Sequence, residues 1–289
     1  MAQARRIPRV LSIAGSDSGG GAGIQADLKA FAACGVHGMT AITAITAQNT
    51  VGVTAVHAIP PEAIIAQVRA VADDIGIDAV KVGMLGDRPT IEAVASALGE
   101  LPDTTPVVID PVMVAESGAV LLEPEARSAL IEELLPRATV LTPNVPEART
   151  LVGESAGTGA IEVETLARRV HALGPSAVVV TGGHREPVTD VFFDGRRLVE
   201  LPGERHEHGA AHGSGCTHSS VLAARLARGD EPLQAARAAR ELASRAVAQG
   251  LREIGAGAGP VDILGIAGNP DARAVFVSSS ALGTGTLLA

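Results

Sequence analysis

The sequence predicts an α/β protein with a mostly parallel sheet and helices on both of its faces. Short apolar, β-branched runs alternate with longer amphipathic stretches, which is the pattern of successive β-α-β units. Several short runs are apolar throughout, as expected of strands covered on both faces. No Pro/Ser-rich linker divides the 289 residues. We therefore expect one domain over residues 1–266, followed by a loosely ordered C-terminal tail over 267–289 that lacks periodicity.

The predicted strands are runs rich in Val, Ile, Ala and Thr. In chain order they are residues 9–14, 39–47, 53–59, 79–82, 106–109, 139–142 and 177–181. Two further runs, 189–194 and 197–201, flank a turn at Gly195 and predict a β-hairpin.

Helices are predicted where apolar residues recur every three or four positions. The clearest spans 61–75, with Ile64, Val68 and Val71 on one face and Pro61 at its start. The others are residues 24–33, 90–98, 124–135, 145–151, 161–173, 214–228 and 232–249.

Composition excludes several classes of function. The net charge is -9, whereas a nucleic-acid binder carries a basic footprint. The chain has no Trp, no Tyr and only 4 Phe, so stacking platforms for single strands are not expected. No uninterrupted apolar run reaches the length of roughly 18 residues that a membrane span needs. Two Cys do not make a disulfide framework, and we expect a cytoplasmic protein that binds neither nucleic acid nor membrane.

A glycine-rich loop at residues 15–23 joins the first strand to the first helix. The carboxyl ends of parallel strands are where open α/β sheets bind ligands, and clustered glycines let the backbone approach a ligand closely. The loop is not a Walker A motif, because no G-K-[ST] follows it. It is not a dinucleotide fingerprint either, because Ala26 stands where the last Gly would be needed. The alternative interpretation is a flexible turn.

A second small-residue segment, His212 to Thr217, opens a long predicted helix. Unpaired amides and the helix dipole make such an N-terminus an anion site suited to phosphate. Cys216 lies inside it, and a thiol at a helix N-terminus is expected to have a lowered pKa. Cys216 would then act as a general base or a nucleophile, unless it is only a small packed residue. Cys34 ends an Ala-rich helix and is expected to be a packing residue.

Polar residues follow other predicted strands. Asp110 and Glu147 follow two neighbouring strands, where carboxylates hold Mg²⁺ beside a phosphate or serve as caps and turns. Gln48 offers a donor pair and an acceptor that match the edge of an aminopyrimidine, or it is a turn amide. Thr181 and Gly183 belong to a strand-to-loop junction that lets a nucleotide approach closely.

Together these motifs resemble the ribokinase-like superfamily, and more closely the bacterial hydroxymethylpyrimidine/phosphomethylpyrimidine kinases of thiamine synthesis. The matching pieces, in the family's order, are A-G-S-D-S-G-G-G-A-G-I-Q-A-D-L-K from Ala14, T-A-Q-N-T from Thr46, K-V-G-M-L from Lys81, D-P-V-M from Asp110, L-T-P-N-V-P-E-A from Leu141, G-G-H from Gly182 and H-G-S-G-C-T from His212. The resemblance covers about residues 8–262. It implies a three-layer α/β/α fold, ATP and Mg²⁺ as cofactors, a small-molecule pyrimidine substrate and a homodimer.

The resemblance also implies roles for individual residues. The pyrimidine site would be lined by Gly15, Ala22, Asp27, Gln48 and Met84. The transferring phosphoryl group would lie in an anion hole made by Gly213, Ser214 and Gly215, with Cys216 as the base that accepts the substrate's hydroxyl proton. Mg²⁺ would be organised by Asp110, Asn144 and Glu147, and ATP would lie near Thr181, Gly183 and Asn144.

The chain departs from the family pattern in two places. Thr181 precedes Gly-Gly-His, where the family often has Lys. A cation near the ATP phosphates is then either missing or replaced by an Arg. Ala211 precedes His-Gly, where Thr is usual.

Three alternatives to the pyrimidine kinase remain at this point. A pyridoxal kinase of the same superfamily would share the Gly-Cys loop, although T-A-Q-N-T favours the pyrimidine. A Cys-dependent hydrolase or acyltransferase would need His212 or His218 within reach of Cys216. A ligand-binding regulator would have kept the fold and lost the activity.

Overall fold

The computed structural model describes residues 6–115, 118–154, 162–183, 186–207 and 209–268. An eight-stranded sheet has the order β10-β9-β8-β7-β6-β5-β1-β2, and β3 and β4 form a separate two-stranded sheet. Neighbouring strands from β2 across to β8 pair in parallel, whereas β9 and β10 are antiparallel. The predicted mostly parallel α/β fold is therefore confirmed. Most of the predicted tail lies outside the described residues.

The strands agree closely with the apolar runs. Their bounds are β1 Arg9–Ala14, β2 His37–Ile42, β3 Ala44–Gln48, β4 Val53–Ala58, β5 Ala79–Val82, β6 Val107–Ile109, β7 Val140–Leu141, β8 Val178–Val180, β9 Thr189–Phe193 and β10 Leu198–Pro202. The predicted hairpin is the pair β9–β10.

Apart from α4, the helices begin and end within a few residues of the predicted bounds. They are α1 Gly23–Ala33, α2 Pro61–Asp74, α3 Arg88–Gly99, α4 Arg127–Ala129, α5 Val145–Leu151, α6 Val163–His171, α7 Ser214–Ala227 and α8 Pro232–Ala248. Among the described residues, none of the helices is long and apolar enough to cross a membrane.

Two predicted elements were wrong in detail. The run 39–47 is not one strand, because the chain leaves the large sheet at Thr43, whose hydroxyl donates to the Met84 carbonyl at 2.8 Å. The run 124–135 is not a regular helix: α4 is flanked by 3₁₀ turns and a π-helical segment, Leu130–Leu134. Pro136 follows directly and has no amide hydrogen to donate, which breaks the α-helical pattern there.

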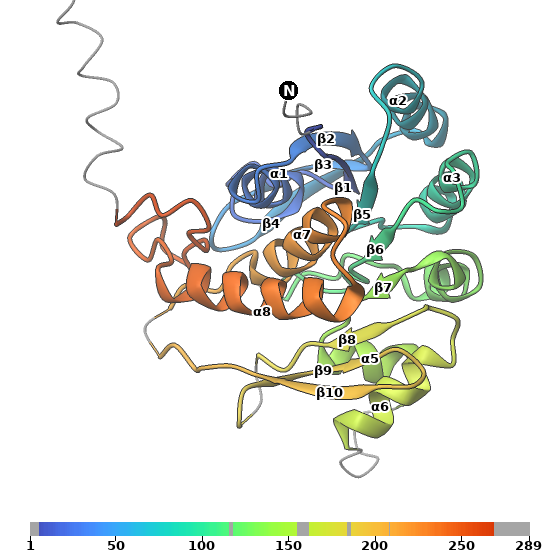
Figure 1. The fold of residues 1–289 in the computed structure, drawn as a ribbon. Coiled ribbons are helices and arrows are strands. Elements are labelled where there is room, and N and C mark those ends of the chain that lie inside the picture. Colours follow the sequence, from blue (N-terminus) through green and yellow to red (C-terminus); the bar gives the residue numbers. More distant parts are fainter. Residues whose placement is uncertain (1–5, 116–117, 155–161, 184–185, 208, 269–289) are drawn as a thin grey trace, which may run out of the picture.

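Two hydrophobic cores lie on opposite faces of the sheet. Leu11 and Ile13 of β1 pack with α2, α3, α5 and α6, whereas Val10, which precedes them, packs with α1, α7 and α8. The alternation of side chains along a strand produces this division. Figure 1 shows the resulting layers, with α1, α7 and α8 on one side of the sheet. Cys34 at the end of α1 is half-buried against the second core, as a packing residue would be.

The functional residues follow from this topology. Loops leave the carboxyl ends of β1, β5, β6, β7 and β8 on one edge of the sheet, and α7 begins beside them. Motifs that are far apart in the sequence are thereby brought together.

Candidate active site

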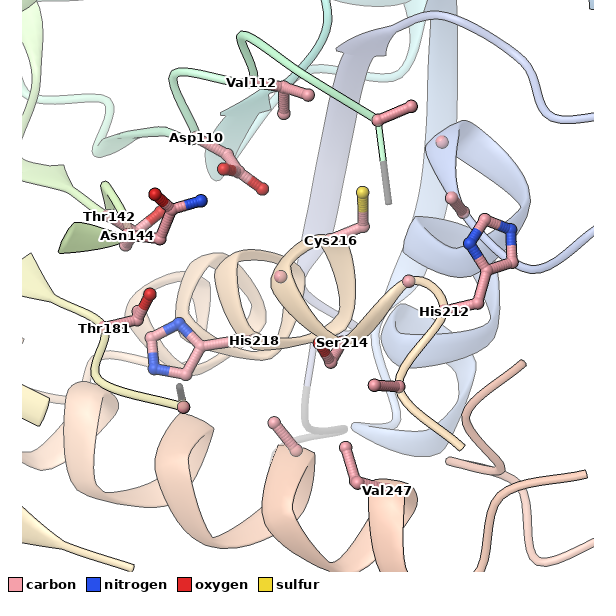
Figure 2. A pocket seen from close by; sticks show the side chains of 18 of the residues that line it. Asp110, Val112, Thr142, Asn144, Thr181, His212, Ser214, Cys216, His218 and Val247 are labelled. Carbon is pink, nitrogen blue, oxygen red and sulfur yellow. The ribbon is translucent and has the colours of Figure 1, made fainter. Parts of the chain in front are cut away.

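One cavity of about 410 Å³ lies at that edge of the sheet. It is lined by every site residue that the sequence predicted except Asp27: Gly15, Ala22, Gln48, Met84, Asp110, Asn144, Glu147, Thr181, Gly183, Gly213, Ser214, Gly215 and Cys216. Figure 2 shows Asp110, Thr142, Asn144 and Thr181 on one side of Cys216 and His212 on the other. The cavity is thus elongated, with the start of α7 near its middle.

The glycine-rich loop is organised by a buried carboxylate. Asp17 Oδ1 accepts the amide hydrogen of Gly19 at 2.8 Å, and its Oδ2 accepts those of Gly21 and Ala22 at 3.0 and 2.8 Å. The same Oδ2 lies 2.9 Å from His212 Nε2. Although burial opposes the charge, these hydrogen bonds hold the pKa of Asp17 below its usual value. Asp17 and His212 therefore connect the loop after β1 to the loop before α7.

The end of the cavity beside this loop carries the residues predicted for the ring. Gln48 ends β3, and its backbone is held by Ser18, whose hydroxyl donates to the Gln48 carbonyl at 2.6 Å. Its side-chain oxygen accepts from the Thr46 hydroxyl at 3.2 Å. Met84 lies against Gly15, where a Cβ would stand only 2.4 Å from the Met84 methyl carbon. The absence of a Cβ at Gly15 thus makes room for the Met84 side chain at this end of the cavity.

The start of α7 has the backbone of an anion site. Gly213 caps the helix with φ 81°, and a Cβ there would lie 1.8 Å from the Gly21 carbonyl oxygen. Glycine is therefore required. The Ser214 amide donates to the Ala211 carbonyl at 2.9 Å. Ser214 is thus not a free donor, whereas the amides of Gly213, Gly215 and Cys216 have no backbone acceptor in the described part of the chain.

The expectation of a lowered thiol pKa at Cys216 was wrong. Burial raises the pKa of this thiol to about 12, and the charges of Asp110 and Asp27 add to the effect. Lys81 and a hydrogen bond from the Gly23 amide act in the opposite direction without outweighing it. Cys216 is therefore a protonated thiol, with its sulfur pointing into the cavity (Figure 2).

Two carboxylates face the same space from the ends of β6 and β7. Asp110 Oδ2 accepts from the Ser219 hydroxyl at 3.0 Å, and Glu147 accepts from the amides of Asn144 and Met113. Asn144 and Glu147 form a capping box at the start of α5, so the capping interpretation also holds. Burial and the charge of Asp110 raise the pKa of Glu147 to about 8, and burial raises the pKa of Asp110.

Asp27 does not lie in the wall of the cavity, in contrast to the prediction. Its side chain is fully buried beneath the cavity, where it pairs with Lys81 at 2.9 Å. It also accepts from the hydroxyls of Ser12 at 2.5 Å and Ser220 at 2.7 Å. Ser12 and Lys81 belong to β1 and β5, and both point toward α1 and α7. Asp27 is therefore the centre of a buried cluster that supports the site.

Sequence reasoning did not assign several residues of the cavity wall, which include Asp190, His218 and Arg240. His212 and His218 were considered only as partners for a Cys nucleophile. His212 instead contacts Asp17, and His218 lies 3.8 Å from Asp190. The alternative of a Cys-dependent hydrolase therefore lacks its base. The signal for Asp190 and Arg240 was absent, because neither lies in a recognisable motif.

The residues that the sequence predicts to lie near ATP are close together in the structure. Asn144 and Thr181 form a parallel bridge that extends the pairing of β7 and β8. The Gly182 amide donates to Asp190 Oδ1 at 2.8 Å, which fixes the loop that carries Gly183. Among the described residues, no group of three or more His, Cys, Asp or Glu could hold a metal ion by itself. Any divalent cation would thus need ligand oxygens in addition to the two carboxylates.

Comparisons with known proteins identify the family of this chain. A family described as phosphomethylpyrimidine kinase matches residues 17–262. A hydroxymethylpyrimidine/phosphomethylpyrimidine kinase of Rhizobium meliloti is 50% identical over 254 residues, which cover 87% of this chain and 95% of that protein. One from Haemophilus influenzae is 46% identical, with coverage of 89% and 96%. The structure of a Bacillus subtilis pyridoxal kinase in an ADP complex has a TM-score of 0.81 and 39% identity, and covers 91% of this chain and 100% of that one. The chain belongs to the phosphomethylpyrimidine kinase family and is a phosphotransferase with the ribokinase-like fold.

Proposed function

We propose that this chain phosphorylates the hydroxymethyl group of 4-amino-5-hydroxymethyl-2-methylpyrimidine, and then converts the monophosphate to the diphosphate, with ATP as the donor. These are two steps of thiamine biosynthesis. One observation carries the proposal: Gln48, the free amides of α7 and the Asp110–Glu147 carboxylates all face one cavity. The names of the relatives, at 50% and 46% identity, support the substrate class.

Phosphoryl transfer depends mainly on positioning and on stabilising charge. Gln48 would hold the aminopyrimidine edge through its amide, with Gly15 and Met84 against the ring. The amides of Gly215 and Cys216 would then face the phosphoryl oxygens, where the positive end of the α7 dipole favours negative charge. Asp17 and His212 would hold the two loops at a constant separation.

Cys216 would receive the hydroxyl proton. A thiol that retains its own proton does not act as a base, so the charges around it decide its role. Burial has the largest effect and opposes the thiolate, Lys81 favours it, and Asp110 and Asp27 oppose it. Neutralisation of Asp110 would therefore lower the pKa of Cys216 and allow it to accept the proton.

The cavity fits Mg²⁺ as the group that neutralises Asp110. Both carboxylates have a pKa raised by burial, and the charge of Asp110 raises that of Glu147 further; such a pair is a donor set that a hard divalent cation completes. Mg²⁺ typically takes one or two carboxylates and completes its shell with water and phosphate oxygens. Asp110 and Glu147 would hold it, and Asn144 would orient Glu147. The ion would supply positive charge beside the transferring phosphoryl group.

A pyridoxal kinase is the second candidate, because the chain is 39% identical to the pyridoxal kinase of Bacillus subtilis over nearly its full length. Both activities would use the same α7 amides and Cys216, so only the ring-binding end of the cavity distinguishes them. A polar Gln48 at that end favours the aminopyrimidine.

A homodimer in the cytoplasm is also part of the proposal. Ile45 and Val56 on the β3–β4 sheet are about half exposed and supply apolar surface for a second copy. Cytoplasmic ATP would be the donor. Light scattering on the purified chain would give twice the mass of 29.1 kDa if the dimer forms.

The test is ADP release with Mg-ATP and three acceptors: the hydroxymethylpyrimidine, its monophosphate and pyridoxal. Turnover of both pyrimidines that is largely lost in Gln48→Ala supports the proposal. Gln234→Ala, on the exposed outer face of α8, is the matched control and should leave the rates unchanged. Turnover of pyridoxal alone would establish the second candidate. No ADP release with any acceptor would refute the kinase and favour a binding protein.

A further inference from the structure

A buried polar cluster in the cavity wall has no role in the chemistry proposed above. Asp190 of β9 lies 3.4 Å from Arg240 Nη1 of α8 and 3.8 Å from His218 Nε2 of α7. All three residues line the cavity. Figure 2 shows the His218 ring beside Thr181, on the opposite side of Cys216 from His212. The cluster therefore lies at the end of the cavity away from the substrate loop.

The cluster has more polar atoms than partners. Both ring nitrogens of His218, Nε and Nη2 of Arg240 and Oδ2 of Asp190 are buried and have no hydrogen-bond partner among the described residues. Native proteins leave few such groups, because each unsatisfied one costs free energy. His218 is only 5% exposed. These atoms indicate a site that a polar ligand completes.

The free donors of the cluster indicate a ligand with acceptor oxygens. Asp190 balances the charge of Arg240 at 3.4 Å, but Nε and Nη2 of the guanidinium have no acceptor among the described residues. Burial and the Arg240 charge lower the pKa of His218, so its ring is neutral and can donate one hydrogen bond. Thr181, Gly183 and Val188, which line the same end, carry no charge. A guanidinium with free donors is well suited to phosphate oxygens.

The surrounding backbone leaves space for the guanidinium. Arg240, Ala243, Ser244 and Val247 line the cavity at a spacing that places them on one face of α8. Across from Arg240 lies Gly203, where a Cβ would stand 1.8 Å from Nη2 and 2.4 Å from Cζ. Any larger residue at position 203 would displace the guanidinium. The apolar stretch of the α8 face then extends away from it toward Val247.

We propose that Arg240 binds the phosphate chain of the nucleotide, with Asp190 and His218 positioning its guanidinium. The inference rests on the proposed function, in that the donor is a nucleoside triphosphate. From the α7 amides the chain of phosphates would extend toward Thr181 and His218, where Arg240 supplies the positive charge. Arg240 is thus a nucleotide-binding residue, and Asp190 and His218 are positioning residues.

Calorimetric titration with ADP and with adenosine tests this without turnover. In Arg240→Met the ADP affinity should fall at least tenfold, because the phosphate contact is lost, whereas adenosine should bind as it does to the wild type. Arg237→Met, one turn earlier and on the exposed face of α8, is the control and should bind both ligands normally. Arg240→Lys should recover part of the ADP affinity.

Gly203→Ala is a second, smaller perturbation that leaves the charge in place. Its methyl group should displace the guanidinium and weaken ADP binding while adenosine binding is unchanged. Unchanged ADP affinity in a folded Arg240→Met variant would overturn the inference and leave the proposed function intact. An equal loss for ADP and adenosine would also overturn it, since it would indicate a structural role. A wild-type chain that binds neither would refute the use of ATP, and this inference with it.

Discussion

The buried ion pair of Lys81 and Asp27 is the element whose removal should destabilise the fold most clearly. Both side chains are 0% exposed and their charged atoms are 2.9 Å apart. Lys81→Met would leave the Asp27 carboxylate without its counter-charge in the interior. Removal of one partner of a buried pair costs about 3–5 kcal/mol. Asp27 would keep the Ser12 and Ser220 hydroxyls, so we expect a value near the lower limit, about 3 kcal/mol.

The double variant separates an ion pair from two independent contributions. Asp27→Leu alone should also cost about 3–5 kcal/mol, because the buried Lys81 ammonium loses its partner. When both charges are absent, the remaining loss is that of two hydroxyls without an acceptor, about 1 kcal/mol each. The double variant should therefore be less destabilised than either single variant, at about 2 kcal/mol.

Urea unfolding followed by far-UV circular dichroism is the suitable assay, because the chain has no Trp and no Tyr to report by fluorescence. Arg69→Met is the matched control: it removes an ion pair with Glu100 whose side chains are 57% and 38% exposed, and the midpoint should not move. Additive losses in the double variant would refute the reasoning. The reasoning would also be refuted if Lys81→Met lowered the free energy of unfolding by no more than the control variant does.

Three further predictions follow from the site. His212→Leu should lower the free energy of unfolding by about 1–3 kcal/mol, because the buried Asp17 carboxylate loses a partner at 2.9 Å. The exposed His57→Leu is the control and should leave the free energy of unfolding unchanged. Equal urea midpoints for the two variants would count against the connection between the loops. In a variant without the other Cys, the alkylation rate of Cys216 should keep rising with pH above 10, as a pKa of about 12 requires; a plateau near pH 8 would contradict the raised pKa. Glu147 has a folded pKa of about 8 against 4.5 for the free group, so its contribution to stability is complete below pH 4.5 and is lost as the pH rises through 8. Glu147→Gln should remove this part of the pH dependence. If the pH profile of urea unfolding is unchanged in this variant, the raised pKa is refuted.

Local chemistry made much of the fold predictable. The strands β1 and β5 have the bounds that their apolar runs indicate, because strands buried on both faces need continuous apolar sequence. The helix α2 was evident from one apolar face and a Pro in its first turn. The glycine-rich loop and the segment before α7 were recognised because close backbone approach needs small residues, as the contact of Gly213 with Gly21 illustrates.

Longer-range contacts decided what the sequence analysis missed. Residues 39–47 read as one strand, and only the Thr43 hydrogen bond to Met84 ends it early. Asp27 lies in a family motif, which suggested a ligand contact. In the structure its carboxylate pairs instead with Lys81, which is 54 residues away in the sequence.

The sequence by itself determined the α/β class, the edge of the sheet where ligands bind and part of the cavity wall, because periodicity, glycines and strand ends are local properties. Only the tertiary structure decided the charge state of those residues. The thiol pKa of Cys216 depends on Asp110, Asp27 and Lys81, which come from three other elements, and Arg240 reaches the cavity only because α8 packs beside α7. Electrostatic interactions depend on distances in space and on burial, and neither can be read from the order of residues along the chain.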